Sequence, residues 1–382
     1  ASGRWRMPDE TRDATRDEPA AAQPSDDETI AIRRDEDFDH DAVLRYLQAH
    51  IPGIGAGPLD VRQFPSGRSN LTYLLRAGEW EGVLRRQPLG PVPPRAHDMV
   101  REATLLAKLS AVYPLAPKPY AIEEGPSLLG VPFYVMERRR GIVVDDRFPP
   151  GVTPTPALCT RLSELVVDTL AQLHAIDWRA AGLESFGHPD GFLERQVRGW
   201  IDRYQRARTM EIAAAEPVMR WLAEHVPPSP PATIIHNDFK LNNMLLDLGP
   251  EPRVTGILDW EMCTIGDPLF DLAVSLSYWI QADDPEQMRS GLSTVTTLPG
   301  FYTRRQFVER YAARTGRDIS TPIMGFHMTF AYFKLAVIIQ QIFARWSRGQ
   351  TRDERFAIFG ERVRLLIEHA HQLAESGADA AI

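Results

Sequence analysis

Three polar residues that could take part in catalysis lie on one short stretch, IIHNDFKLNNMLL at residues 234–246. His236 and Asp238 are two positions apart, Asn243 follows five positions later, and apolar, strand-like residues flank the stretch on both sides. A carboxylate on such a loop can orient a hydroxyl group and accept its proton, and an amide oxygen can bind Mg²⁺. The simpler alternative is a polar surface loop of turn and capping residues.

A second carboxylate, Asp259 in VTGILDWE, follows Asn243 by sixteen positions. A hairpin between the two would place them side by side and complete an oxygen-rich site for Mg²⁺. The spacing H-x-D-x-x-x-x-N is that of the catalytic loop in the protein-kinase-like fold. Together these residues predict phosphoryl transfer from ATP, in which Asp238 orients and deprotonates the acceptor while His236 holds the loop from behind.

Two other interpretations of the loop stay open. In the first, the chain binds a nucleotide or ligand without turnover, as a pseudokinase does. In the second, His236, Asp238 and Asp259 belong to a metal hydrolase, although Asn243 is a poor ligand for zinc and no further ligand lies at suitable spacing.

The composition of the 382 residues, 43% hydrophobic and 25% charged, is that of a globular protein long enough for two lobes. The net charge of −8 argues against nucleic-acid binding. The two cysteines are far apart, which favours the reducing cytoplasm, and no uninterrupted apolar run approaches the ~20 residues of a membrane span. Residues 1–36 are rich in charge and proline and are expected to be disordered, and residues 374–382 to form a flexible tail.

The remaining sequence predicts a β-rich lobe followed by a helical lobe. Apolar periodicity predicts a helix at 39–51, three antiparallel strands within 59–88, a helix at 94–112 and two more strands within 127–141. From residue 154 onward the patterns are mostly helical. We therefore expect an α+β, bilobal fold with an N-lobe at 37–138, a short connector, and a C-lobe at 139–373, with a small-molecule site between them.

The loop at 234–246, followed by GILDWEMCTIGDPLFDLA, resembles the aminoglycoside phosphotransferase family, the small-molecule branch of the protein-kinase-like superfamily. The usual family loop reads H-G-D, whereas this chain has Asn237 in place of the glycine. Segments such as SGRSNLTYLL, REATLLAKL and FKLAVIIQQIFARW are similar to the kinase-like domain fused to some acyl-CoA dehydrogenases, and the similarity runs from about residue 38 to about 372. The resemblance implies ATP and Mg²⁺ as cofactors, a small hydroxylated acceptor, and no obligate protein partner.

The resemblance also implies roles for individual residues. Arg85 takes the place of the strand lysine that contacts the phosphates, and Glu102 pairs with it; Arg86 would point to the opposite face of the strand. Asn243 and Asp259 hold Mg²⁺. The turn over the phosphates comprises Gly67, Arg68, Ser69 and Asn70, and the connector that reads adenine through its backbone comprises Met136, Glu137 and Arg139.

Four further residues are expected to be structural. Asp271 resembles the buried aspartate that braces the catalytic loop, and Asp267 can cap the helix that follows it. His174 and His327 lie on apolar helical stretches and are expected to be packed histidines rather than ligands.

The acceptor is indicated only by charge. Residues 194–210 carry five arginines and Arg138, Arg139 and Arg140 form a second basic cluster, although both could be solvated surfaces. If they line the cleft, they favour an anionic acceptor such as a hydroxyacyl-CoA thioester. An aminoglycoside or another small alcohol is the alternative.

Overall fold

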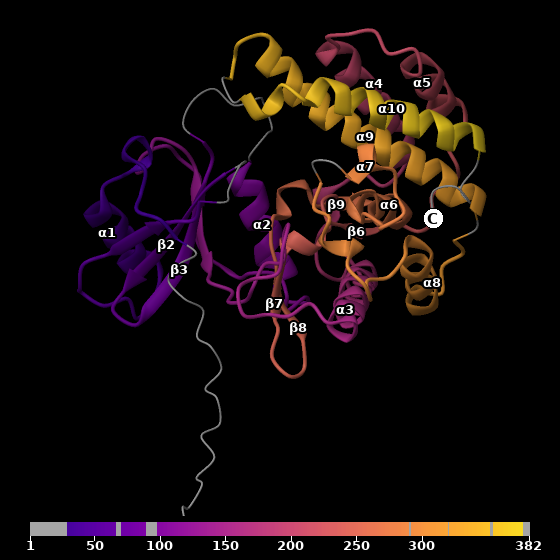
Figure 1. The fold of residues 1–382 in the computed structure, drawn as a ribbon. Helices are drawn as coiled ribbons and strands as arrows, with labels where there is room; N and C mark the ends of the chain where they lie inside the picture. The colour runs from indigo at the N-terminus through magenta and orange to yellow at the C-terminus, as the bar shows by residue number, and fades with distance from the viewer. Residues whose placement is uncertain are drawn as a thin grey trace, which may run out of the picture.

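A computed structural model describes residues 29–65, 70–88, 98–289, 292–319, 321–351 and 354–376. The chain forms two lobes (Figure 1): a sheet lobe, coloured indigo to violet, and a larger, mostly helical lobe, coloured magenta to yellow. This arrangement confirms the predicted α+β, bilobal fold.

The N-lobe is built on a five-stranded antiparallel sheet in the order β1-β2-β3-β5-β4. Its strands are β1 (Asp60–Gln63), β2 (Leu71–Ala77), β3 (Trp80–Arg86), β4 (Pro119–Glu123) and β5 (Phe133–Glu137). Its helices are α1 (His40–His50) and α2 (Met99–Leu109). The side chains of Asp39 and Asp98, which precede them, cap their N-termini.

The prediction of two strands within residues 127–141 is wrong. Only β5 lies there, and the other strand, β4, precedes it at Pro119–Glu123. The chain between them turns at Gly130, whose φ of 74° suits a residue without a side chain and whose N–H donates to the Pro126 carbonyl. The leucines before Gly130 therefore belong to a turn rather than to a strand.

The segment before α1 is more ordered than the sequence predicts. Ile30 and Gln63 exchange two backbone hydrogen bonds, and the guanidinium of Arg86 donates to the Glu36 carbonyl. Residues 29–36 are thus tied to the sheet, and the predicted disorder is wrong for them. Likewise, α10 runs to Ser376, beyond the predicted start of the flexible tail. Residues 1–28 and 377–382 lie outside the described ranges.

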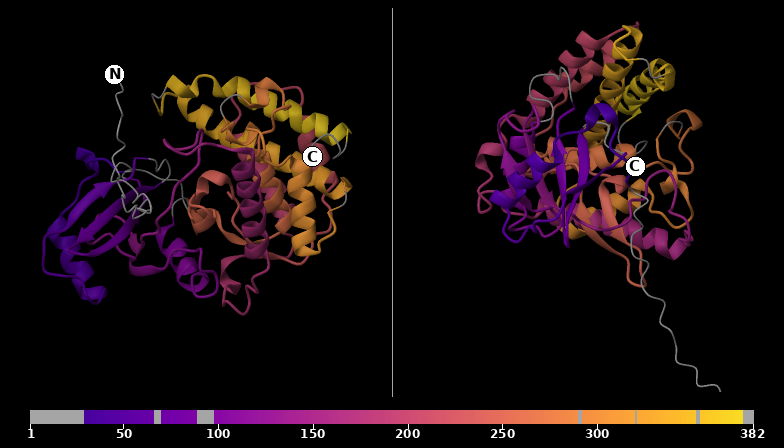
Figure 2. Two further views of the ribbon diagram at one scale, coloured as in Figure 1. Left: turned by 60° about the horizontal axis from the view of Figure 1, so that its bottom comes forward. Right: turned by 90° about the vertical axis from the view of Figure 1, so that its left-hand side faces the viewer.

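The C-lobe combines helices with two small sheets, seen from two further sides in Figure 2. The helices are α3 (Pro156–His174), α4 (Phe192–Ala207), α5 (Ala215–Glu224), α6 (Pro268–Tyr278), α7 (Glu286–Arg289), α8 (Arg304–Thr315), α9 (Thr321–Ser347) and α10 (Phe359–Ser376). The antiparallel strand pairs are β6 (Thr233–Ile235) with β9 (Thr264–Gly266), and β7 (Met244–Asp247) with β8 (Arg253–Ile257).

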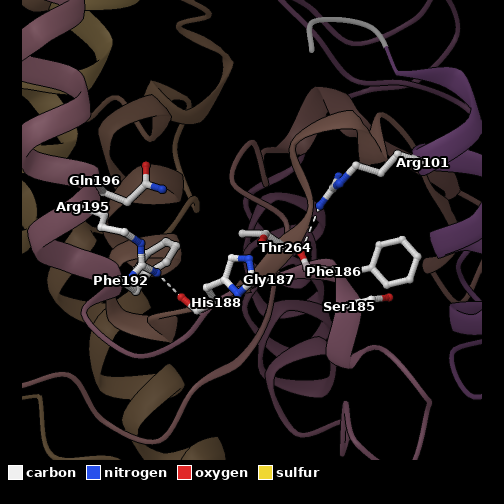
Figure 3. Close-up of a pocket in the computed structure, with 9 residues that line it drawn as sticks. All are labelled: Arg101, Ser185, Phe186, Gly187, His188, Phe192, Arg195, Gln196 and Thr264. Atoms are coloured by element: carbon white, nitrogen blue, oxygen red, sulfur yellow. Dashed lines mark hydrogen bonds between the residues drawn. The ribbon is translucent and has the colours of Figure 1, made fainter.

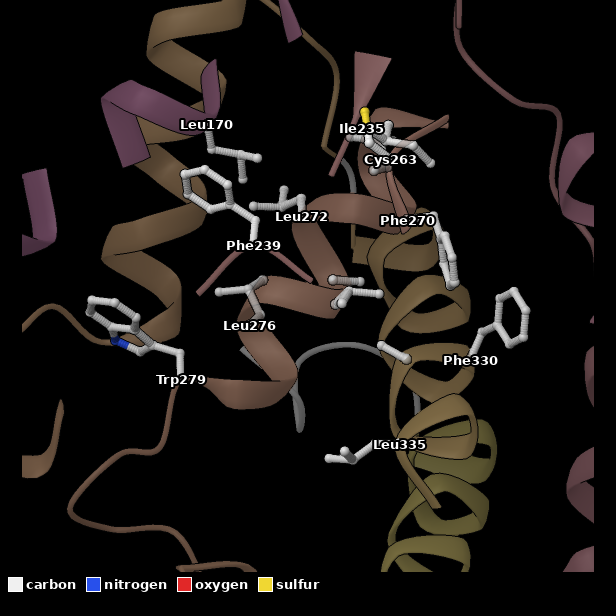
Figure 4. Close-up of a cluster of buried hydrophobic side chains, with 14 of the residues drawn as sticks. Leu170, Ile235, Phe239, Cys263, Phe270, Leu272, Leu276, Trp279, Phe330 and Leu335 are labelled. Carbon is white, nitrogen blue, oxygen red and sulfur yellow. The ribbon is translucent and has the colours of Figure 1, made fainter. Parts of the chain in front are cut away.

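Helix α6 forms the centre of the C-lobe core (Figure 4). Every residue from Pro268 to Ser277 is buried, and Phe270 stacks on Phe330 of α9 with the ring centroids 4.7 Å apart. A helix that is apolar on all sides must be covered on all sides. The residues that follow β6 are therefore hydrogen-bonded to a helix that is itself fully covered.

Helix α9 is long and apolar enough to resemble a membrane span, although the sequence analysis expected no apolar run of that length. Within the described ranges, its part from Ile323 to Ser347 is the one stretch that is long and apolar enough to cross a membrane. However, 89% of its most apolar window is buried inside the protein. The apolar surface of α9 is thus used for packing within the C-lobe.

Candidate active site

The loop between β6 and β7 brings the predicted catalytic residues together. The side-chain amide of Asn243 donates to the Asp238 carbonyl at 2.8 Å and to its carboxylate at 3.0 Å. The ammonium of Lys240 lies 2.9 Å from the same carboxylate. Because the nitrogen of the Asn243 amide is engaged in this way, its oxygen is the atom left for a cation.

The β7–β8 hairpin places Asp259 beside this loop, as predicted. The N–H of Leu258 donates to the Asn243 carbonyl at 2.8 Å, and the Asp259 carboxylate lies 3.2 Å from the Arg85 guanidinium in the N-lobe. The amide oxygen of Asn243 and the carboxylate of Asp259 are hard donors that suit Mg²⁺. Mg²⁺ bound there with a nucleotide would neutralise phosphate charge, and these two residues would hold it.

A metal hydrolase would need more metal-binding side chains than this loop contains. Among the described residues, no three His, Cys, Asp or Glu side chains are grouped so that they could hold a metal ion. Mg²⁺ shared with nucleotide phosphates needs only one or two protein carboxylates. The residues present therefore fit a nucleotide-bound cation better than a protein-held one.

Arg85 and Glu102 form the ion pair that the family resemblance implies. Their charged groups are 3.4 Å apart, and Glu102 is buried on α2. Burial opposes the charge of Arg85, but Glu102 and Asp259 outweigh it and raise the pKa of the guanidinium. Arg85 thus connects α2 to the carboxylate of the proposed cation site.

Asp271 braces the catalytic loop from below, as predicted. Its carboxylate accepts the N–H groups of His236 and Asn237, each at 2.7 Å, and lies 3.1 Å from the His174 ring. Burial would raise the pKa of Asp271, but the hydrogen bond and charge of His174 and the loop amide outweigh it and lower it. The other ring nitrogen of His174 contacts the Tyr311 hydroxyl at 2.6 Å. His174 is therefore a packed histidine that supports the brace.

Asn237 explains the departure from the usual H-G-D loop. Its φ of 67° is left-handed, a conformation that glycine adopts freely and that asparagine tolerates better than most residues. Its side chain donates to the Met262 carbonyl at 3.1 Å. Asparagine thus keeps the backbone geometry and adds a hydrogen bond.

His236, Asp267 and His327 have structural environments. Burial lowers the pKa of His236, and its ring lies 3.0 Å from the Leu258 carbonyl, so it ties the catalytic loop to the hairpin. Asp267 caps α6 by accepting the N–H of Leu269 at 2.8 Å. His327 is fully buried, 3.6 Å from Asp267.

The structure describes only some of the predicted nucleotide-binding residues. Gly67, Arg68 and Ser69 lie outside the described residues. Asn70 donates to the Glu261 carboxylate at 2.9 Å and so joins the two lobes.

The connector follows β5. Met136 is buried, and the N–H of Glu137 already donates to the Lys118 carbonyl at 2.8 Å, so this N–H is not free for a base. The side chain of Arg139 pairs with Glu137 at 3.0 Å. Adenine binding stays a prediction for the remaining backbone groups of the connector.

Most of the predicted basic residues are engaged elsewhere. Arg138 and Arg140 both pair with Glu81, at 2.7 and 2.6 Å, so an anionic acceptor would have to compete with this carboxylate for them. On α4, Arg195 donates to main-chain carbonyls, and Arg206 and Arg208 pair with acidic neighbours. Arg203 differs, because its guanidinium lies 4.6 Å from the Trp200 ring, on the side of the helix that faces α9.

The sequence analysis missed three residues around Asp238. Lys240 carried a signal, since it lies two positions after Asp238 on the same loop. Tyr278 and Lys334 carried none, because only folding brings α6 and α9 to the loop. Burial and the Asp238 carboxylate raise the pKa of Tyr278 well above its usual range.

A cavity of about 320 Å³ lies apart from these residues (Figure 3). The guanidinium of Arg101 donates to the carbonyls of Phe186 and Cys263, and that of Arg195 to the carbonyls of His188 and Asp190. Both cations are therefore engaged by the protein itself. The cavity is lined by Arg101, Ser185, Phe186, Gly187, His188, Phe192, Arg195, Gln196 and Thr264.

A bilobal fold with a hydrogen-bonded carboxylate loop at the junction of the lobes defines a kinase-like phosphotransferase. The sequence pattern of the phosphotransferase enzyme family matches residues 60–301. A Ralstonia eutropha protein assigned as an aminoglycoside phosphotransferase superposes with a TM-score of 0.76 at 30% identity, over 89% of this chain and 99% of that one. The chain belongs to the phosphotransferase enzyme family, whose chemistry is transfer of a phosphoryl group to a small-molecule hydroxyl.

Two further similarities complete the comparison. Acyl-CoA dehydrogenase family member 11 from Gallus gallus is 34% identical over 91% of this chain, which covers 45% of that relative. The chain thus spans about half the length of the curated relatives it matches. An aminoglycoside phosphotransferase in a ternary complex with ADP and hygromycin B shares the fold, with a TM-score of 0.56 at 15% identity over 88% of this chain and 99% of that one.

Proposed function

We propose that this chain transfers the γ-phosphoryl group of Mg²⁺-ATP to a hydroxyl group of a small anionic molecule of the hydroxyacyl-CoA type. As the acceptor oxygen bonds to phosphorus, the bond to ADP breaks and Asp238 takes the hydroxyl proton. The observation that carries the phosphoryl-transfer step is the geometry of Asp238, held by Asn243 at 3.0 Å and by Lys240 at 2.9 Å.

The anionic acceptor is supported by the charges around Asp238. Lys240 and Arg203 both act electrostatically on Lys334, so three cationic groups gather in this region of the C-lobe, and Asp238 and Asp271 act on Lys334 with the opposite sign. A cationic aminoglycoside would be repelled by such a group, whereas a thioester with a phosphorylated carrier would be attracted. The similarity to acyl-CoA dehydrogenase family members supports the same class of acceptor.

The test is detection of phosphorylated product by mass spectrometry. The purified chain is incubated with Mg²⁺-ATP and a panel of hydroxyacyl-CoA thioesters, aminoglycosides, and small amino and sugar alcohols. Asp238→Asn should lower turnover by about 10²- to 10⁴-fold, because the group that accepts the proton is lost. Asp247→Asn is the matched control, since Asp247 ends β7 and pairs with the exposed Arg253.

The outcomes separate the remaining alternatives. Thioester products that disappear with Asp238→Asn support the whole proposal. If only aminoglycosides or simple alcohols are phosphorylated, the chain is a kinase, but the proposal of an anionic acceptor is overturned. ATP binding without any product, measured by calorimetry, would favour the pseudokinase interpretation.

A further inference from the structure

Lys334 of α9 is a buried cation that takes no part in the proton transfer described above. It is 3% exposed, and its ammonium donates a 2.9 Å hydrogen bond to the carbonyl of Asn237, the residue before Asp238. The rings of Trp200 and Phe270 lie 5.8 and 5.3 Å away. Within the part of the chain that the structure describes, no carboxylate forms an ion pair with this ammonium.

Packing alone does not explain a lysine at this position. A buried ammonium without a paired carboxylate is costly, whereas a methionine of similar length would fit between Trp200 and Phe270. Burial lowers the pKa of Lys334 to about 8, although the carboxylates of Asp238 and Asp271 oppose the change. The protein thus retains an unfavourable charge next to its catalytic loop, which is typical of a functional site.

The geometry shows what this charge holds. Asn237 is left-handed, and its N–H is bound by Asp271 of α6 at 2.7 Å while its C=O is bound by Lys334 of α9 at 2.9 Å. One anion and one cation therefore fix both polar groups of the same residue from two different helices. Any rotation of this backbone would displace the carboxylate of Asp238, the next residue.

We propose that Lys334 is a positioning residue for phosphoryl transfer, whose charged ammonium holds the Asn237 carbonyl and thereby fixes Asp238 against the acceptor hydroxyl. This inference rests on the proposed function. It requires the ammonium form, because a neutral amine binds a carbonyl more weakly than a charged donor does.

The charge of Lys334 depends on groups from each element packed around it. Asp238 and Asp271 stabilise the ammonium, and Lys240 and Arg203 destabilise it. On α10, Arg362 faces Tyr278, and on α5 the charged residues are exposed. The charged groups that act on Lys334 are therefore Asp238 and Lys240 from the loop, Asp271 from α6 and Arg203 from α4.

The experiment compares kcat as a function of pH for the whole chain and for three variants. Wild-type kcat should fall as pH rises through about 8, where the ammonium is lost. Lys334→Met should lower kcat at pH 7 on the order of tenfold and remove this alkaline fall. Lys334→Arg should keep part of the activity and move the fall to higher pH. Lys108→Met is the matched control, since Lys108 also donates to a carbonyl, that of Gly182, but is exposed, and it should leave kcat unchanged.

A second measurement shows directly whether Lys334 titrates. With a folded-state pKa of about 8 against an ordinary value of 10.5, the unfolded chain binds more protons between these pH values. Wild-type thermal stability should therefore rise relative to that of Lys334→Met as pH increases from 8 to 10. A constant difference between the two would show that Lys334 keeps its proton throughout this range and would overturn the assignment of the alkaline fall in kcat to this residue.

The activity results separate two failures. Wild-type turnover together with an unaltered kcat and pH profile in Lys334→Met would overturn the role of Lys334 alone. Absence of wild-type turnover with every acceptor would refute the proposed function, and the inference with it. If Lys334→Met does not fold, Lys334→Arg decides, because an unshifted alkaline fall in that variant would overturn the inference.

Discussion

The carboxylate of Asp271 is the buried anion on which the catalytic loop rests, and Asp271→Asn tests that arrangement. The wild-type carboxylate accepts two loop N–H groups at 2.7 Å and lies 3.1 Å from the His174 ring. Asparagine has the same shape but only one acceptor oxygen. One loop N–H therefore faces an NH₂ group and loses its partner, and the negative charge is lost as well.

The expected cost follows from these contacts. Hydrogen bonds to a charged group contribute about 1.5–3 kcal/mol each, and breaking a buried charged network costs about 3–5 kcal/mol. We expect Asp271→Asn to lower the free energy of unfolding by about 3–5 kcal/mol. Turnover should also fall, on the order of tenfold, because the backbone that positions Asp238 loses one of its supports.

Thermal and urea unfolding, followed by circular dichroism at pH 7, provide the assay. Asp247→Asn is again the matched substitution, and its exposed pair with Arg253 should contribute under about 1 kcal/mol. The pKa of Asp271 is lowered in the folded state, since His174 and the loop amide outweigh burial. Its stabilisation is therefore complete above the unfolded pKa and is lost as pH falls through the folded one. If Asp271→Asn and Asp247→Asn were equally stable and equally active, the brace would have no energetic role.

Two further predictions concern a buried ion pair and a half-buried histidine. Arg85→Met leaves Glu102 buried without its ion-pair partner, so it should lower the free energy of unfolding by about 3–5 kcal/mol and weaken ATP binding. Arg85→Lys keeps a positive charge and should lose less stability and less ATP affinity. Thermal melts and calorimetry with ATP, carried out on both variants, check this. Burial lowers the pKa of His369 to about 4 from an ordinary 6.5, so the unfolded chain binds more protons between these values and stability is lost as pH falls through this window. His369→Gln should flatten that dependence in thermal melts from pH 7 to 4.5, and an equally steep fall in the variant would contradict the assignment.

The sequence determined the local part of the site. The spacing of His236, Asp238 and Asn243 placed them on one loop, and the apolar run before Asp259 placed it at the end of a hairpin strand; the structure has both features. These relations are local, because strand alternation and tight turns depend on neighbouring residues. The pairing of Arg85 with Glu102 followed from the family resemblance, and the geometry agrees with it.

Two differences between the sequence analysis and the structure share one physical cause. Charge and proline content indicated disorder at residues 29–36, but Ile30 pairs with Gln63 on the edge of a sheet that composition cannot reveal. The arginines at 138–140 were expected to favour an anionic acceptor only if they line the cleft, and the structure pairs Arg138 and Arg140 with Glu81 from another strand. In each case a partner distant in sequence decides the outcome.

Only the tertiary structure determined what surrounds the catalytic loop. Asp271 was expected beneath the loop by resemblance, but the structure alone shows Lys334, 97 positions from Asn237, bound to the opposite side of the same residue. Neither periodicity nor spacing in the sequence carries that information, because the contact depends on how α6 and α9 pack. The sequence thus identified the residues suited to the chemistry, and the packing of the helices decided which charges hold them in place.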